Sequence, residues 1–164
     1  MALLDEQLVD EWLNRNGFFT MRGIKCGIDE IDLLAVKHCN IDPQYWHVEV
    51  QISYRPIGYI GGDTNARKRS DEEIKGGVEQ WVLKKFKSEK KVEKRNSILP
   101  NVNWRFILVH AVLRDENELK YMKGMGVELI PYKQILTELR SSKSQSSSSV
   151  ASNIVEILQY IEKD

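Results

Sequence analysis

The sequence predicts an α/β fold in which helices flank a mixed central sheet. Apolar residues spaced three and four apart, typical of helices, alternate along the chain with short runs rich in β-branched residues, typical of strands. With 164 residues, of which 41% are hydrophobic and 29% charged, the chain is long enough for one domain with a sizeable core. The expected order is α-β-β-β-α-β-α-β-α, followed by one further amphipathic helix.

The first part of the chain is expected to form one helix and three strands. Leu4, Leu8 and Leu13 belong to an apolar arc on the helix, which Asn16-Gly17 ends in the way a C-terminal glycine usually does. Strands joined by short turns tend to be neighbours, so the three strands are expected side by side. The predicted ranges are 3–16 for the helix and 18–26, 30–37 and 45–53 for the strands.

The second part of the chain is expected to contain four helices, two strands and a linker. The run WRFILVHAV is apolar enough for a central strand, and SSKSQSSSS has the composition of a mobile linker. The predicted ranges are 71–94, 115–123 and 132–140 for helices, and 104–112 and 127–131 for strands. We therefore divide the sequence into a domain at 1–140, a serine-rich linker at 141–149 and an amphipathic helix at 150–164.

Composition argues against several classes of protein. The 24 basic and 24 acidic residues give a formal net charge of zero, so a polyanion would have to be held by a local basic patch. No apolar run approaches the roughly 20 residues that cross a bilayer, and the acidic N-terminus is not a secretory signal. Cys26 and Cys39 lack metal-binding spacing, so we expect reduced thiols in a cytoplasmic protein.

Polar residues interrupt two of the apolar strands. In HVEVQ, residues 47–51, alternation places the valines on one face and His47, Glu49 and Gln51 on the other. Asp32 lies in the preceding strand, in the run EIDLLAV. A buried carboxylate costs free energy unless something pairs with it. Since the two strands are expected to be adjacent, Asp32 and Glu49 are expected to lie close together near the sheet centre.

Two adjacent carboxylates repel each other, and a divalent cation with hard oxygen ligands relieves that repulsion. Mg²⁺ prefers one or two carboxylates, waters and a substrate phosphate, and it can activate water beside a phosphorus centre. Gln51 lies about 7 Å from Glu49 along the strand. It can orient such a water but cannot supply charge. A metal ion held between these carboxylates would suit a reaction in which water attacks phosphorus.

These residues also resemble a known motif. An acid in one strand, followed by Glu-x-Lys in the next, marks the PD-(D/E)XK nuclease superfamily. In this chain the motif reads Asp32 and then Glu49-Val50-Gln51, with glutamine in the position of the lysine. The superfamily's restriction-endonuclease-like αβββαβ core matches the order predicted for residues 3–112.

Further residues are similar to the Holliday-junction resolvase branch of that superfamily. Members of the branch open with a helix that bears a metal-site glutamate, followed by a Gly-Phe pair and often by an arginine near the DNA. The corresponding residues here are Glu6, Gly17-Phe18 and Arg22. The resemblance covers about two-thirds of the chain and leaves the C-terminal part unaccounted for.

The resemblance implies a DNA endonuclease that depends on Mg²⁺ or Mn²⁺. Asp32, Glu49 and Glu6 would hold the metal with the Val50 carbonyl, and Gln51 would orient the attacking water. Some restriction enzymes of the superfamily carry glutamine at that position and still cut, whereas other members have lost activity. The alternative is therefore a catalytically inactive nucleic-acid-binding or protein-interaction subunit with the same fold.

Two basic clusters are candidates for contact with nucleic acid. KKFKSEKKVEKR, residues 84–95, holds seven basic residues and two glutamates, and lysines near a cleft would neutralise phosphates. A solvated helix end explains the same run without any ligand. DNA is the expected partner, RNA stays open, and a homodimer would suit paired cuts in two strands. The basic residues assigned to DNA contact, besides Arg22, are Arg67, Lys68 and Arg69 of the loop and Lys84 and Lys85 of the helix.

Each acid of the predicted site has a plainer reading. Glu49 fits an edge strand with its carboxylate in solvent, and Asp32 fits a capping or salt-bridged aspartate. Glu6 suits the first turn of any helix because of the helix dipole. Asp29 and Glu30 compete with Asp32, and Asp5 competes with Glu6. Gln80 and Lys84 lie one turn apart on the long helix and either face the site or belong to a solvated helix face. The histidines show no metal spacing: His38, His47 and His110.

Overall fold

The computed structural model describes residues 4–52, 69–111, 115–143 and 149–161. A five-stranded mixed sheet, with strand order β1-β2-β3-β4-β5, forms its centre. The first three strands form an antiparallel meander, and β3, β4 and β5 are parallel. The strands are β1 (Phe19–Cys26), β2 (Asp29–Lys37), β3 (Gln44–Gln51), β4 (Arg105–His110) and β5 (Val127–Pro131). The predicted mixed sheet flanked by helices, with its first three strands side by side, is confirmed.

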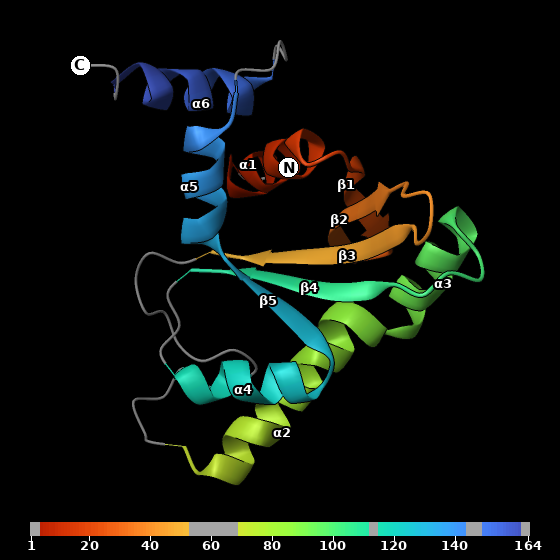
Figure 1. Ribbon diagram of the computed structural model, residues 1–164. Helices are drawn as coiled ribbons and strands as arrows, with labels where there is room; N and C mark the ends of the chain where they lie inside the picture. The colour runs from red at the N-terminus through yellow and green to blue at the C-terminus, as the bar shows by residue number, and fades with distance from the viewer. Residues whose placement is uncertain (1–3, 53–68, 112–114, 144–148, 162–164) are drawn as a thin grey trace.

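Helices cover both faces of the sheet (Figure 1). On one side lie α1 (Leu4–Arg15), α5 (Tyr132–Ser141) and α6 (Val150–Ile161). On the other lie α2 (Asp71–Val82), the π-helical segment η1 (Leu83–Lys87), α3 (Glu89–Ile98) and α4 (Glu116–Gly124). No helix within the described ranges is long and apolar enough to cross a membrane.

The prediction of one long helix at 71–94 is wrong in one respect, because the helix is interrupted at Ser88. Ser88 has an extended backbone, with φ −60° and ψ 144°, and it separates η1 from α3. The Arg95 Nη1 group donates to the Phe86 carbonyl at 2.7 Å, so a contact from the second helix stabilises the end of the first. The N-terminus of α2 follows the sequence pattern, since Ser70 and Glu73 form a capping box.

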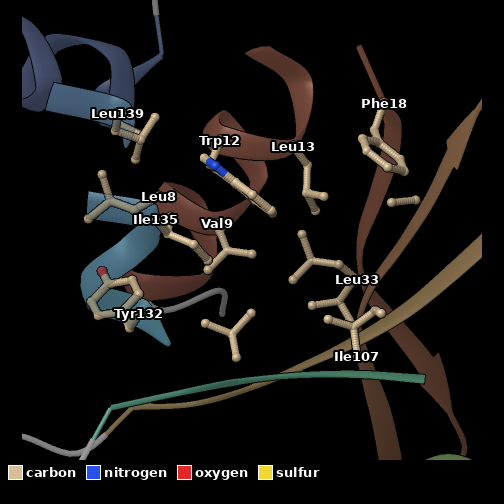
Figure 2. Packing of buried hydrophobic residues seen from close by; sticks show 14 of the residues in the cluster. Leu8, Val9, Trp12, Leu13, Phe18, Leu33, Ile107, Tyr132, Ile135 and Leu139 are labelled. Atoms are coloured by element: carbon tan, nitrogen blue, oxygen red, sulfur yellow. The ribbon is translucent and has the colours of Figure 1, made fainter. Parts of the chain in front are cut away.

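The largest apolar core lies between the sheet and the helices α1, α5 and α6 (Figure 2). Leu13 and Val9 of α1 are fully buried against Leu33 of β2 and Ile107 of β4. A second cluster on the opposite face contains Phe86. The sheet is therefore buried on both sides, as a parallel central strand such as β4 requires.

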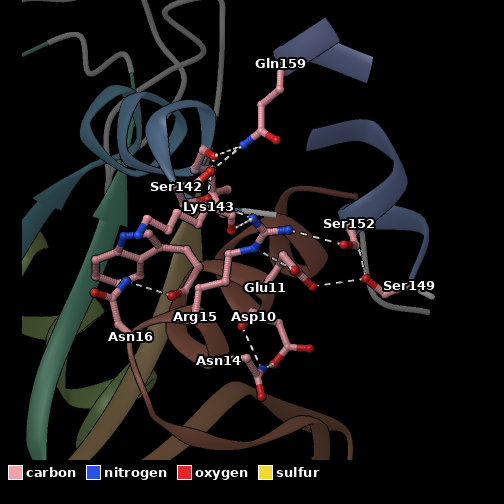
Figure 3. A network of polar contacts seen from close by, with 12 residues as sticks. Asp10, Glu11, Asn14, Arg15, Asn16, Ser142, Lys143, Ser149, Ser152 and Gln159 are labelled. Carbon is pink, nitrogen blue, oxygen red and sulfur yellow. Dashed lines mark hydrogen bonds and ion pairs between the residues drawn. The ribbon is translucent and has the colours of Figure 1, made fainter. Parts of the chain in front are cut away.

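The C-terminal helix α6 packs on α1 and α5 and is part of the same core, to which it contributes Ala151 and Val155. Polar contacts fix it at the edge of that core (Figure 3). Arg15 of α1 donates to Ser142 Oγ at 2.8 Å and to Ser152 Oγ at 3.2 Å. Its Nε pairs with Glu11 at 2.8 Å. The first and last helices are thus joined by both apolar and charged groups.

Candidate functional site

The candidate site lies where β2 and β3 separate. The described pairing between these strands runs from Lys37–Gln44 to Leu33–Val48. Beyond that pair, the Val50 N–H donates to Asp32 Oδ2 at 2.7 Å, so a side chain takes the place of a strand partner. Glu49 is the residue before Val50 and lies on the other face of β3, and it is only 1% exposed. Asp32 and Glu49 are therefore brought together, as predicted, but Glu49 is buried rather than at a solvated edge.

Three side chains surround the Glu49 carboxylate. Its Oε1 accepts hydrogen bonds from His47 Nε2 at 2.9 Å and from Lys91 Nζ at 2.7 Å. Its Oε2 accepts from Lys85 Nζ at 3.0 Å. Lys91 is 2% exposed, whereas the side chain of Lys85 is 32% exposed. Lys85 therefore lies at the solvent-exposed rim of the cluster, and Lys91 lies in its buried interior.

The His47 ring is oriented by the groups on either side of it. Arg95 Nη1 lies 2.8 Å from His47 Nδ1. Because a guanidinium can only donate, Nδ1 must accept, which leaves the proton on Nε2 facing Glu49. Burial lowers the pKa of His47 to about 4, so the ring is neutral at pH 7 and this tautomer is the one expected. The ring also stacks edge-on against Phe86, with 4.9 Å between ring centroids.

The two carboxylates of the site are shifted in opposite directions. Burial, and then the charge of Glu49, raises the pKa of Asp32 to about 7. For Glu49, burial acts in the same direction, but the His47 hydrogen bond and the charges of Lys85 and Lys91 outweigh it and lower the pKa. Lys85 has a raised pKa, because the attraction of Glu49 and Asp32 exceeds the effect of its burial. At neutral pH, Glu49 is therefore ionised and Asp32 is close to its midpoint.

The donor set at this position consists of hard oxygens, which suit Mg²⁺ or Mn²⁺. The raised pKa of Asp32 means that its charge is poorly compensated, and a cation would relieve this. Within the described ranges, no three or more His, Cys, Asp or Glu side chains lie close enough together to form a metal-binding group. Glu49 is instead held by lysines, so binding a metal through it requires Lys85 to move aside.

The other residues of the predicted site lie at different depths. Glu6 of α1 is 8% exposed, and its charge contributes to the raised pKa of Asp32. Gln51 is exposed at the last residue of β3. Arg22 lies on the α1 side of the sheet, where its Nε pairs with Asp10 at 3.0 Å. The structure therefore brings Asp32 and Glu49 together, but within the described residues Glu6 does not complete a three-ligand group with them, and Arg22 of β1 is paired with the first helix.

The basic residues assigned to DNA contact are not equivalent. Arg69 forms an ion pair with the buried Glu118 and so anchors the start of α2 on α4. Lys84 is exposed, whereas Lys85 turns inward to Glu49. Arg67 and Lys68 lie outside the described residues.

Sequence reasoning missed the inner part of this cluster. Lys91 and Arg95 belong to a run that reads as a solvated basic helix, yet both are buried. Their spacing of four residues places them on one face of α3, but Lys90 and Lys94 have the same spacing, so it did not single them out. His47 was placed correctly on the face of Glu49, but its full burial was not expected.

Comparison with known proteins adds little to this geometry. No family model matches the sequence, and no curated protein is significantly similar to it. Among solved structures, a crystal structure described as a protein of unknown function, AF1548, aligns with a TM-score of 0.49 and 17% sequence identity, covering 98% of this chain and 67% of that chain. Similarity at this level carries no argument about function.

Proposed function

We propose that this protein is a metal-dependent DNA endonuclease that hydrolyses phosphodiester bonds. The observation that carries the proposal is the pair of carboxylates at the point where β2 and β3 separate, with Asp32 at a pKa of about 7 beside the ionised Glu49. The order of elements from α1 to β4, a helix, three strands, helices and a strand, supports a restriction-endonuclease-like core. It also supports the PD-(D/E)XK resemblance carried by Asp32 and Glu49-Val50-Gln51.

Asp32, Glu49 and Glu6, with the Val50 carbonyl, would hold Mg²⁺ or Mn²⁺. When bound, the metal activates water and stabilises charge at phosphorus and on the departing oxygen. The Val50 N–H fixes one oxygen of Asp32, so this carboxylate is oriented before any ligand arrives. His47 and Lys91 fix one oxygen of Glu49 in the same way.

Lys85 supplies the positive charge that Gln51 lacks. Its ammonium lies 3.0 Å from Glu49 Oε2, and its partial exposure allows it to turn from Glu49 toward a substrate phosphate. The π-helical turn of η1 carries this lysine, and such turns are frequent at functional sites. Gln51, at the exposed end of the strand, would orient the attacking water.

The proposal is tested by incubating branched, nicked and duplex DNA with Mg²⁺ and the wild-type protein, Asp32→Asn, Glu49→Gln or the surface variant Glu128→Gln. We expect cleavage by the wild type and by the surface control, and a loss of at least 100-fold in both site variants. Their DNA binding should change little. Normal turnover by folded Glu49→Gln protein would overturn the assignment.

Calorimetry with Mn²⁺ separates this proposal from a second candidate, a nuclease-fold subunit that binds nucleic acid or protein without catalysis. The saturation of both Glu49 oxygens by His47, Lys91 and Lys85 favours that candidate. Under the endonuclease proposal, Mn²⁺ binds the wild type in the presence of DNA and binding is lost in Asp32→Asn. Under the alternative, DNA binds, Mn²⁺ does not, and no DNA is cut.

A further inference from the structure

A second basic feature lies beside the candidate site. A cavity of about 460 Å³ opens between the β1–β2 turn and α3. Lys25, Cys26 and Gly27 form one wall, and Lys90 and Lys94 form the other. Lys90 and Lys94 belong to the run 84–95, which the sequence offered as a candidate nucleic-acid contact, whereas Lys25 was assigned no role.

Helix α3 links this cavity to the Glu49 cluster. Lys91 and Arg95, four residues apart, point inward to Glu49 and His47. Lys90 and Lys94, also four residues apart, lie on the neighbouring face and line the cavity. One short helix therefore presents two basic stripes, the first neutralised inside the protein and the second open to a ligand.

The outer stripe retains its positive charge. Within the described part of the chain, neither Lys90 nor Lys94 forms an ion pair, whereas Lys25 pairs with Glu30. Glu93 is the acidic residue that lines the cavity. The cavity therefore has an excess of ammonium groups, which favours an anion with several oxygens, such as a phosphate.

We propose that this cavity binds the phosphate backbone of DNA next to the bond that is cut, with Lys90 and Lys94 as its phosphate-binding residues. The inference rests on the proposed function, and it names a substrate-binding position for the same site. Ile28, at the tip of the β1–β2 turn, is 96% exposed beside the cavity. An exposed apolar side chain there provides a contact for a sugar or base, which a nucleic acid has and a free phosphate lacks.

The first test measures DNA binding without cleavage, in the presence of EDTA, as a function of salt. The test variant is Lys90→Gln/Lys94→Gln, and the matched control is Lys75→Gln/Lys120→Gln, which removes the same charge from exposed positions on α2 and α4. Losing two phosphate contacts should make the slope of log K against log salt less negative by about 2 and should weaken binding at low salt roughly 10-fold or more. The control should leave the slope unchanged.

A second test follows the Cys26 thiol, which lines the cavity and is 5% exposed. In a Cys39→Ser background, a small maleimide reports on Cys26 alone. DNA should slow its modification at least fivefold, and inorganic phosphate at the same phosphate concentration should not. Equal protection by inorganic phosphate would indicate a small-anion site and would overturn the proposal.

The outcomes for the cavity and for the nuclease are separable. An unchanged salt slope in Lys90→Gln/Lys94→Gln, or no DNA binding by the wild type, overturns the cavity proposal even if metal-dependent cleavage is observed. A less negative salt slope in Lys90→Gln/Lys94→Gln, together with protection of Cys26 by DNA, supports the cavity proposal. This holds even if Asp32→Asn and Glu49→Gln cut DNA as the wild type does, which would overturn the nuclease proposal alone.

Discussion

The two sides of the central sheet are stabilised in different ways. Under α1, α5 and α6 the buried side chains are almost all apolar, and Leu13, Leu33 and Ile107 pack into one continuous core. Under η1 and α3 the sheet instead buries Glu49 and Lys91 beside apolar residues such as Phe86. Each side is closed to water, but only the second buries charged groups against the sheet itself, since the Arg15–Glu11 pair of the first side lies between helices at the edge of the core.

The difference shows where specificity resides in this fold. Apolar burial is non-directional and tolerates residues of similar volume. A buried carboxylate tolerates only an arrangement that satisfies its oxygens, and Glu49 has three donors for this purpose. A substitution of Glu49 on the charged side therefore removes the hydrogen-bond acceptor of His47, Lys85 and Lys91 at once.

The largest effect is expected from Glu49→Leu. This change leaves Lys91 buried without a counter-charge, and breaking a buried pair in this way costs about 3–5 kcal/mol of unfolding free energy. Urea unfolding measures the loss. Adding Lys91→Met should recover a large part of it, because the orphaned charge is removed as well. A single variant as stable as the wild type would show that the cluster contributes nothing to stability.

A similar but slightly smaller effect is expected on the apolar side from Leu13→Ala. Leu13 is fully buried in the core of Figure 2, and truncation to alanine costs about 3 kcal/mol through lost burial and the cavity left behind. Because no charge is involved, the loss measured by urea unfolding should be the same at pH 5 and pH 8 and at low and high salt. A marked dependence on pH would contradict the contrast between the two sides.

At pH 4 the smallest effect is expected from Asp32→Asn, and the pH dependence of this effect is the most diagnostic of the charged side. The folded protein raises the pKa of Asp32 from 3.8 to about 7, so between these values the folded state binds more protons than the unfolded state. Stability arising from this group therefore falls as pH rises through that window. We expect the variant to match the wild type near pH 4 and to be more stable by up to about 4 kcal/mol at pH 8, since each unit of the pKa shift corresponds to about 1.4 kcal/mol.

His47 opposes this trend within the wild-type protein. Its pKa is lowered from 6.5 to about 4, so the unfolded state binds more protons between these values and stability falls as pH drops. Because His47 is present in both proteins, its effect cancels in the difference between wild type and Asp32→Asn. A difference in stability that does not change with pH would contradict the raised pKa of Asp32.

Local patterns were sufficient to predict most of the fold. The strands around the turn at Gly27 and the helix that ends at Asn16-Gly17 follow from short-range periodicity and turn residues. The proximity of Asp32 and Glu49 followed from the rule that strands joined by short turns are neighbours. These features depend on residues close together in the sequence.

The features that could not be predicted depend on distant residues. The break at Ser88 lies in a run without proline or glycine, and the Arg95 contact that stabilises it forms only when α3 folds back. Lys91 is 42 positions from Glu49, and nothing in its local sequence distinguishes it from a solvated lysine. From its sequence a lysine-rich helix is predicted to be exposed to solvent, and only the three-dimensional structure shows which carboxylate pairs with a buried lysine.

The joining of α1 and α6 has a consequence for synthesis of the chain. Arg15 and Ser152 are 137 positions apart, and the apolar face of α1 packs partly on α6. At the usual rate of translation, that separation corresponds to a delay on the order of ten seconds between the two segments. During this interval the nascent chain presents a helix face that only its own later residues will cover.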